Sequence, residues 1–337
     1  MSTIRDVARR AGVAPITASR VLNRSGSFSD AARARVEAAV AELGYVPNRV
    51  AQSLRSRRTR MIGLVLTDIT NPFWTTIARA VEDVTSARGY HVIVCNTDES
   101  DTKQKQYLDL LLQTQVDGFL LVPASDAVEE IARIQQRDVP LVVLDRTLPL
   151  PVDVVRADSE GGAYQLTEHL LELGHRRIAI LSGPRDTSVA VDRIAGCVRA
   201  LEERELAVDP SLVFHGAFTQ ESGAAMTRQA LFARPRPTAL FAVNNFIAIG
   251  AIRAIREANL RIPEEIALVG FDDLPEHLVL EPFLTVAAQP AYEMGRRAAE
   301  RLLDRLTQDG PHDYREVVLP TPLIVRRSSG GPVSKES

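Results

Sequence analysis

The first predicted element is a short amphipathic helix. From Ile4 to Ala11, apolar residues recur at positions i, i+3, i+4 and i+7, which places them on one helical face. Thr3 and Asp6 have the spacing of a capping box, and Gly12 is expected to end the helix. A helix this short is not stable alone in water, so it must pack against a neighbour.

A second short helix is predicted from Pro15 to Leu22. Proline suits the first turn of a helix because its missing N–H has no intrahelical partner there. Ala18, Val21 and Leu22 form a narrow apolar stripe. The side chains left facing outward are Ile16, Thr17, Ser19 and Arg20. Two short helices joined by a tight turn have helix-turn-helix geometry, in which the second helix reads DNA, although a plain helical hairpin shows the same pattern.

A third predicted helix favours the DNA-reading interpretation over the plain hairpin. Ser29 is placed to cap it, the residues from Val36 to Leu43 repeat the helical apolar spacing, and Gly44 ends it. Three such helices close one small hydrophobic core. We therefore expect an all-α helix-turn-helix headpiece at the start of the chain.

Beyond residue 60 the pattern changes to short apolar runs that alternate with helix-length segments. This alternation is typical of βαβ units and a parallel sheet. Two similar sets follow one another, which predicts an α/β core of two doubly wound lobes. The predicted strands are Ile62–Leu66, His91–Cys95, Gly118–Val122, Leu141–Leu144, Arg177–Leu181, Val213–His215, Thr238–Val243 and Ile266–Gly270, and the second set has helices near Glu160–Leu173, Val191–Arg204, Gln220–Phe232 and Ile247–Ala258.

The charge of the chain is divided unevenly. The 337 residues are 45% hydrophobic and carry a formal net charge of −3, which is ordinary for a protein of two or three domains. Residues 1–60, however, contain twelve arginines, no lysine and four carboxylates. A basic segment that coincides with a helix-turn-helix pattern indicates salt-dependent binding to DNA phosphates rather than a merely solvated face.

Other chemistries have little support in the sequence. Cys95 and Cys197 lack metal-binding spacing, so we expect buried thiols, no metal and no cofactor. The six histidines lack the spacing of metal ligands, and the chain has no dinucleotide-binding, P-loop or nucleophile-elbow motif, so an enzyme is not expected. The start of the chain does not resemble a signal peptide, and no apolar run approaches the ~18 residues of a membrane span, which predicts a cytoplasmic protein without a membrane partner.

Four motifs in the first 52 residues resemble the LacI/GalR (lac-repressor) family of bacterial transcription regulators. They are Asp6-Val-Ala, Ala11-Gly-Val, Ser19-Arg-Val-Leu-Asn23 and Pro47-Asn-Arg-Val-Ala-Gln52. The resemblance implies a headpiece at 1–46, a hinge helix and linker at 47–60, and an effector-binding core at 61–327 that is similar to periplasmic sugar-binding proteins. It divides the core into an N-lobe of about 61–157 and 288–318 and a C-lobe of about 158–287 and 319–327, with Ala291–Leu306 returning to the former and Pro322–Arg326 ending on the latter. Residues 328–337 have no leucine heptads, so we expect a disordered tail and no tetramerising coiled coil.

The resemblance also implies how DNA is bound. A homodimer would place two headpieces on a pseudo-palindromic double-stranded operator. The hinge segment is too short to stand alone and would order only against its partner and DNA, with Leu54 wedged between base steps in the minor groove. Ala14 departs from the family, which usually has Ser or Thr there to cap the second helix. The expected DNA-binding residues are Thr3, Pro15, Ile16, Thr17, Ser19, Arg20, Asn23, Asn48, Val50, Ala51 and Leu54.

An effector site is expected where the strands of both lobes end. Ligands bind beyond the carboxyl ends of parallel strands, and a sugar needs aromatic faces together with carboxylate, amide and guanidinium groups. We expect a monosaccharide, with a ribose-like aldopentose first. Taken singly, these residues could instead be helix caps, turn residues or, for Asp145 and Arg146, a local ion pair. The residues that match the family's sugar site are Asn71, Phe73, Trp74, Asp145, Arg146, Arg193, Asn244, Asp272 and Gln289, and Asn245 departs from the Asp of many relatives.

The sequence therefore predicts a sugar-responsive DNA-binding regulator, most simply a repressor of sugar-utilisation genes. A catabolite-control type of regulator that uses a protein co-regulator, and a sugar-binding receptor without a role in transcription, are the alternatives. The sign of the response is open, because an effector changes DNA affinity only through its differential affinity for two conformations.

Overall fold

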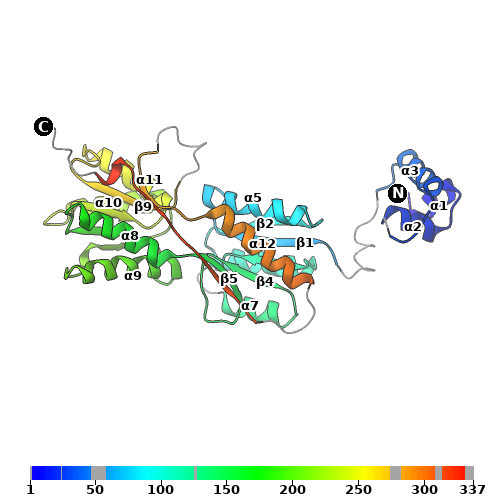
Figure 1. Ribbon diagram of the computed structural model, residues 1–337, viewed down its shortest axis with the longest axis horizontal. Helices are drawn as coiled ribbons and strands as arrows, with labels where there is room; N and C mark the ends of the chain where they lie inside the picture. Colours follow the sequence, from blue (N-terminus) through cyan, green and yellow to red (C-terminus); the bar gives the residue numbers. More distant parts are fainter. Residues whose placement is uncertain are drawn as a thin grey trace. The chain divides into compact units, whose positions relative to one another are not determined.

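The computed structural model describes residues 2–23, 25–46, 58–124, 127–273, 282–307 and 313–330 (Figure 1). The chain forms two compact units, Met1–Thr59 and Arg60–Ser337. The first contains helices α1 (Ile4–Ala11), α2 (Pro15–Leu22) and α3 (Asp30–Leu43). Of the predicted hinge helix and linker at 47–60, residues 47–57 lie outside the described ranges.

Local signals set the helix boundaries in the first unit. The side chain of Thr3 accepts a hydrogen bond from the Asp6 N–H, and Asp6 accepts one in return from the Thr3 N–H, so the capping box is present. Gly12 ends α1 with φ of +62°, a left-handed conformation that favours glycine. Ser29 caps α3 through the Ala32 N–H. Residues of all three helices, including Val7, Ala18 and Val36, then bury one shared core.

Six strands of the second unit form the sheet of what we call the first lobe. The strand order is β11-β5-β4-β3-β1-β2, and all neighbours are parallel. Helices α5 and α12 lie side by side on one face of this sheet, and α6 and α7 cover the other (Figure 1). The elements are β1 Met61–Leu66, α5 Pro72–Ser86, β2 His91–Asn96, α6 Asp101–Gln113, β3 Gly118–Leu121, α7 Val128–Gln135, β4 Leu141–Leu144, β5 Asp153–Ala157, α12 Ala291–Thr307 and β11 Glu316–Leu319.

The second lobe repeats this layout. Its strand order is β12-β10-β9-β8-β6-β7, and only β12 runs antiparallel to its neighbour. The helices pack in the pairs α8 with α9 and α10 with α11. The elements are α8 Ser159–Glu172, β6 Ile178–Ser182, α9 Ser188–Glu203, the 3-10 turn Pro210–Leu212, β7 Val213–His215, α10 Gln220–Phe232, β8 Ala239–Ala242, α11 Asn245–Glu257, β9 Ala267–Phe271, β10 Thr285–Ala287, β12 Leu323–Ile324 and the 3-10 turn Arg327–Ser329.

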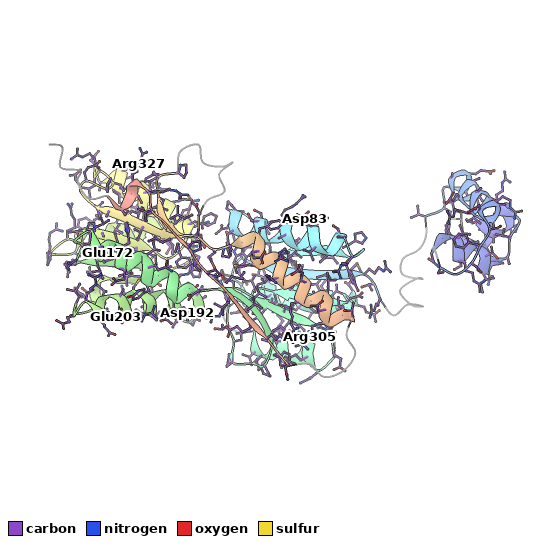
Figure 2. All side chains as sticks on the ribbon, in the orientation of Figure 1. Asp83, Glu172, Asp192, Glu203, Arg305 and Arg327 are labelled. Carbon is purple, nitrogen blue, oxygen red and sulfur yellow. The ribbon has the colours of Figure 1, made fainter. Side chains whose placement is uncertain are left out.

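Buried charge holds α12 against the first sheet. Asp153, at the start of β5, is 1% exposed. It accepts a hydrogen bond from Nε of Arg301 at 2.9 Å and one from Nε of Arg305, which Figure 2 labels, at 2.6 Å. The Arg315 N–H also donates to it. A carboxylate removed from water needs such partners, so this cluster joins α12, β5 and the approach to β11.

The predicted fold class is confirmed, but three details of the prediction were wrong. The sequence pattern did not identify β5, β10, β11 or β12 as strands. Helix α9 begins at Ser188 rather than near Val191. Disorder was expected from residue 328, yet Ser328 and Ser329 are buried, and Oγ of Ser328 donates to the Leu268 carbonyl at 2.6 Å.

Candidate effector cavity and DNA-reading helix

Helix α2 presents the outward face expected of a DNA-reading helix. Ile16 is 62% exposed, which is unusual for a large apolar side chain, and Pro15, Arg20 and Asn23 are also exposed. Thr17 and Ser19 are only partly exposed, so the outward face is narrower than predicted. Nδ2 of Asn23 donates to Oγ of Ser19 at 3.2 Å.

Of the other expected DNA-binding residues, the structure describes Thr3 but not the four residues of the hinge. Thr3 is exposed, but its hydroxyl donates to Asp6 at 2.7 Å and is part of the cap of α1. Ala14 occupies the N-cap of α2 and makes no side-chain hydrogen bond there. The four hinge residues Asn48, Val50, Ala51 and Leu54 lie outside the described part of the chain.

In the second unit, all nine predicted effector residues line one cavity of about 270 Å³. Asn71, Phe73, Trp74, Asp145 and Arg146 come from the first lobe. Arg193, Asn244 and Asp272 come from the second lobe, and Gln289 lies between β10 and α12, where the chain recrosses. The cavity is also lined by Thr67, Asp68, Asp98, Glu99, Val189, Ala217, Phe218 and Thr219.

The two lobes contribute Asp145 and Asp272 in the same way. Each aspartate directly follows the third strand from the β11 or β12 edge of its sheet, β4 or β9. Their backbone φ angles are +66° and +69°, in the left-handed region that only a few residue types tolerate. Their N–H groups donate to Val155 and Ala287 of the neighbouring strands at 2.9 and 3.0 Å. The repeated geometry turns both carboxylates out of the sheets and into the cavity wall.

Arg193 is one of two buried arginines that line this cavity, together with Arg146. Its side chain is held by Nη1, which donates to the Val243 carbonyl at 2.5 Å, and by Nε, which donates to Oγ of Ser159 at 3.3 Å. The guanidinium carbon lies 3.8 Å from the centre of the Phe271 ring. Burial raises the pKa of Asp272, and the charge of Arg193 opposes this rise. Arg193 therefore stabilises the ionised form of the cavity carboxylates.

Burial also shifts the pKa of the second cavity aspartate, Asp145. Burial raises its pKa to about 6, against the opposing charges of Arg193 and Arg146. Its Oδ1 atom and Oε1 of Gln289 are buried without a hydrogen-bond partner among the described residues. Buried acceptors are costly unless a donor meets them. The cavity wall is thus suited to a ligand that donates hydrogen bonds.

Arg146 does not form the local ion pair with Asp145 that the sequence left open. Its Nη1 and Nη2 atoms donate to Glu99 at 2.8 and 2.5 Å, and Nη1 also donates to the Pro123 carbonyl at 2.6 Å. Glu99 was not predicted as a cavity residue. Glu99 follows β2, another strand that ends at this edge of the sheet. That position was the sequence signal that could have identified it as a cavity residue.

The cavity has three aromatic side chains rather than the predicted two. Phe73 and Trp74 meet edge to face, with ring centres 4.6 Å apart. Phe218, in the loop after β7, is the third. Its ring packs against Gly183, where an added Cβ atom would come within 2.3 Å of it. The position of Phe218 shortly after a predicted strand was the sequence signal that could have identified it as a cavity residue.

A metal site and a membrane-spanning helix are both missing from the described residues. Within those ranges, no cluster of His, Cys, Asp or Glu has the arrangement of a metal site. Among the helices that the structure describes, none has the length and apolarity to cross a membrane. Cys197 is buried, and burial raises the pKa of its thiol to about 12, which makes it unreactive.

Comparisons with known proteins agree with both units. Residues 3–48 match the model of bacterial regulatory proteins of the lacI family, and residues 59–326 match that of periplasmic binding proteins and the sugar binding domain of the LacI family. The ribose operon repressor of Halalkalibacterium halodurans is 39% identical over the full length of both chains. The chain belongs to the LacI family of bacterial regulatory proteins. It is accordingly a LacI-family transcriptional repressor with a sugar-binding domain, not an enzyme.

Further LacI-family relatives carry different names, and their solved structures hold different bound molecules. The transcriptional repressor PurR of Vibrio atlanticus is 37% identical, with 98% of both chains covered. A lac repressor dimer bound to operator and an anti-inducer has a TM-score of 0.86, 31% identity and coverage of 98% and 99%. A LacI-family regulator of Enterococcus faecium with bound ribose has a TM-score of 0.71, 31% identity and coverage of 80% and 98%. Membership of the family therefore does not identify the effector, which depends on the residues of the cavity.

Proposed function

We propose that this LacI-family repressor acts as a homodimer on a pseudo-palindromic operator of sugar-utilisation genes and responds to a monosaccharide, with a ribose-like aldopentose first. The observation that carries the effector assignment is the cavity itself. It is small, and it combines aromatic faces with unpartnered acceptors and a buried guanidinium. The names of a 39% identical ribose operon repressor and of a ribose-bound structure support this assignment.

Cavity size favours a single sugar ring. Pockets for drug-sized ligands span ~300–1,000 Å³, and this cavity has about 270 Å³. The hydroxyls of one sugar ring supply the donors that Asp145 and Gln289 lack, and its C–H faces suit Phe73, Trp74 or Phe218.

The main competing effector is a purine, a small planar ring that aromatic side chains also bind. Phe218 offers a surface to either kind of ring, so the choice rests on charge. Asp145, Asp272, Arg146 and Arg193 are all at most 7% exposed. A wall this rich in charged groups suits a ligand dense in hydroxyls better than a planar base.

Calorimetric titration of the full-length protein separates these effectors. We expect heat of binding with ribose or a related pentose, and none with hypoxanthine, guanine or sugar phosphates. Asp272→Ala should lower the affinity for the sugar by about tenfold or more, because it leaves Gln289 without its acceptor. Heat with a purine alone, or unchanged sugar binding by Asp272→Ala, would show that the effector site is wrongly assigned.

Binding of the sugar should depend on pH through Asp145. Burial places the pKa of this carboxyl at about 6 in the free protein. Hydroxyl donors stabilise the ionised form, so the bound state has the lower pKa, and below about pH 6 binding must first displace a proton. Affinity should therefore be constant above about pH 7 and fall by up to about tenfold per unit below pH 6.

The variant Asp145→Asn is the control for this pH profile. It lacks the titrating group, so its affinity, although weaker, should show no step between about pH 5 and pH 7. A wild-type affinity that stays constant down to about pH 5 would contradict the role of Asp145 as an ionised acceptor.

Operator binding is expected to require two copies of the chain. One three-helix headpiece covers few base pairs, and a two-fold dimer presents two headpieces to two half-sites. Light scattering of the operator complex at saturating protein should give the mass of a dimer on one operator. A monomer on the operator would contradict this assembly, and a tetramer in solution would contradict the expectation that residues 328–337 form no tetramerising coiled coil.

A further inference from the structure

One pair of side chains joins the two lobes directly beside the cavity. Asn71 follows β1 of the first lobe, and Asn245 begins α11 of the second lobe. Nδ2 of Asn71 donates to Oδ1 of Asn245, and Nδ2 of Asn245 donates to Oδ1 of Asn71, both at 2.9 Å. The two residues are 6% and 1% exposed. Two buried hydrogen bonds between the lobes therefore break together if the lobes move apart.

Each asparagine is also held within its own lobe. Oδ1 of Asn71 accepts a further hydrogen bond from the Phe73 N–H at 3.0 Å and so caps α5. The backbone N–H of Asn245 donates to the carboxylate of Asp272. A continuous chain of hydrogen bonds thus runs from Asp272 in the cavity wall, through Asn245 and Asn71, to the first turn of α5.

We propose that the Asn71–Asn245 pair is a latch that holds the lobes closed and links the cavity wall of the second lobe to α5 of the first. An amide carries both a donor and an acceptor, so two amides pair reciprocally only at one relative distance and orientation. Parting the lobes leaves two buried amides unsatisfied until water reaches them. The latch accordingly favours the closed conformation, and a ligand that binds this conformation finds it already populated.

A second hydrogen bond between the lobes offers an independent reporter of closure. The Thr147 N–H, in the segment after β4, donates to Oγ of Ser188 at 3.0 Å. It shares no residue with the latch. The Asp145 N–H, two residues away, donates to Val155 within the first lobe and serves as the internal reference.

Two variants remove the latch from opposite sides in the full-length protein. Asn245→Ala deletes the amide and keeps the backbone N–H that donates to Asp272. Asn71→Ser keeps a good N-cap for α5 and deletes the amide. The matched control is Gln104→Ala, which deletes a fully buried amide whose oxygen accepts from Ala124 within the first lobe.

The test is residue-resolved amide hydrogen exchange without sugar. We expect the Thr147 amide to exchange about tenfold faster in each latch variant, and no faster in the double variant than in the singles, since either loss breaks the same pair. The Asp145 amide should exchange at its wild-type rate in each latch variant. In the Gln104→Ala control, the Thr147 and Asp145 amides should both exchange at their wild-type rates. Thr147 exchange that is unchanged in both single variants, or that accelerates additively in the double variant, would overturn the latch.

The latch proposal rests on the proposed function only for the choice of ribose as the ligand. A sugar titration therefore tests the two proposals separately. Both latch variants should bind ribose several-fold more weakly than wild type, because part of the binding free energy then closes the lobes. If ribose fails to bind any variant and Thr147 still exchanges faster, the effector proposal fails and the latch stands. If ribose binds all variants equally, the link between latch and cavity is refuted.

Discussion

Replacing Arg193 by alanine is expected to abolish the response to sugar while the repressor still binds its operator. The charge of the guanidinium opposes the burial-driven rise of the pKa values of two buried carboxylates, Asp145 and Asp272. Removing one partner of a buried charge network costs ~3–5 kcal/mol, because the remaining charges stay uncompensated. We therefore expect sugar affinity in Arg193→Ala to fall by about a hundredfold or more.

Two variants show whether this loss is specific to the cavity. Arg199→Ala removes an exposed arginine of the same helix, which pairs with Glu160, and should bind sugar as wild type does. Arg193→Lys keeps the charge but loses the planar fork and the stacking on Phe271, so its affinity should lie between those of wild type and Arg193→Ala. Operator affinity is measured for each variant by gel shift with and without sugar. Release from the operator by ordinary sugar concentrations in Arg193→Ala would refute the assignment.

The second large effect is expected from Arg20 on the DNA-reading helix. Arg20 is exposed in the last turn of α2, and its aliphatic stem packs against the turn at Gly26. A bidentate contact from arginine to a guanine contributes ~1–3 kcal/mol. A dimer makes the contact in both half-sites, so Arg20→Ala should lower operator affinity by about a hundredfold and leave binding to random DNA nearly unchanged.

Arg20→Lys distinguishes base reading from phosphate binding. It retains the positive charge, so a phosphate contact would survive with a similar salt dependence, whereas a bidentate base contact would be lost. We expect Arg20→Lys to resemble Arg20→Ala on the operator. A randomised-site selection should show relaxed preference at the base pairs that Arg20 and the exposed Ile16 read. An unchanged preferred sequence for Arg20→Ala and Ile16→Ala would mean that α2 is not the reading element.

The sequence alone determined the elements whose signals are local. The headpiece helices have the predicted bounds because capping by Thr3 and Ser29, and chain reversal at Gly12 and Gly44, depend on residues a few positions apart. It also located the cavity, since the carboxyl ends of parallel strands meet at one edge and polar side chains there share a site. All nine residues that the family resemblance implied line this cavity, although Arg193 lies within a helix rather than at the end of a strand.

Only the tertiary structure decided which of these groups pair. Glu99 rather than Asp145 became the partner of Arg146, because the segments that follow β2 and β4 bring these two side chains together although 47 residues separate them. The Asn71–Asn245 pair joins residues 174 positions apart. No periodicity or capping signal records contacts of this range, because the first depends on how the strands of one sheet are arranged and the second on how the two sheets stand against each other.

Ser328 and Ser329 are a further case in which the tertiary structure decided what the sequence did not predict. Gly and Ser after residue 327 carry no hydrophobic pattern, so the sequence favoured disorder. Ser328 and Ser329 are nevertheless buried, because polar groups of distant strands and helices satisfy their hydroxyls: Oγ of Ser329 lies 2.8 Å from Oγ of Thr285 and 2.9 Å from Nε2 of His169. Burial of a polar side chain depends on partners that only the folded chain assembles, and local composition does not reveal them.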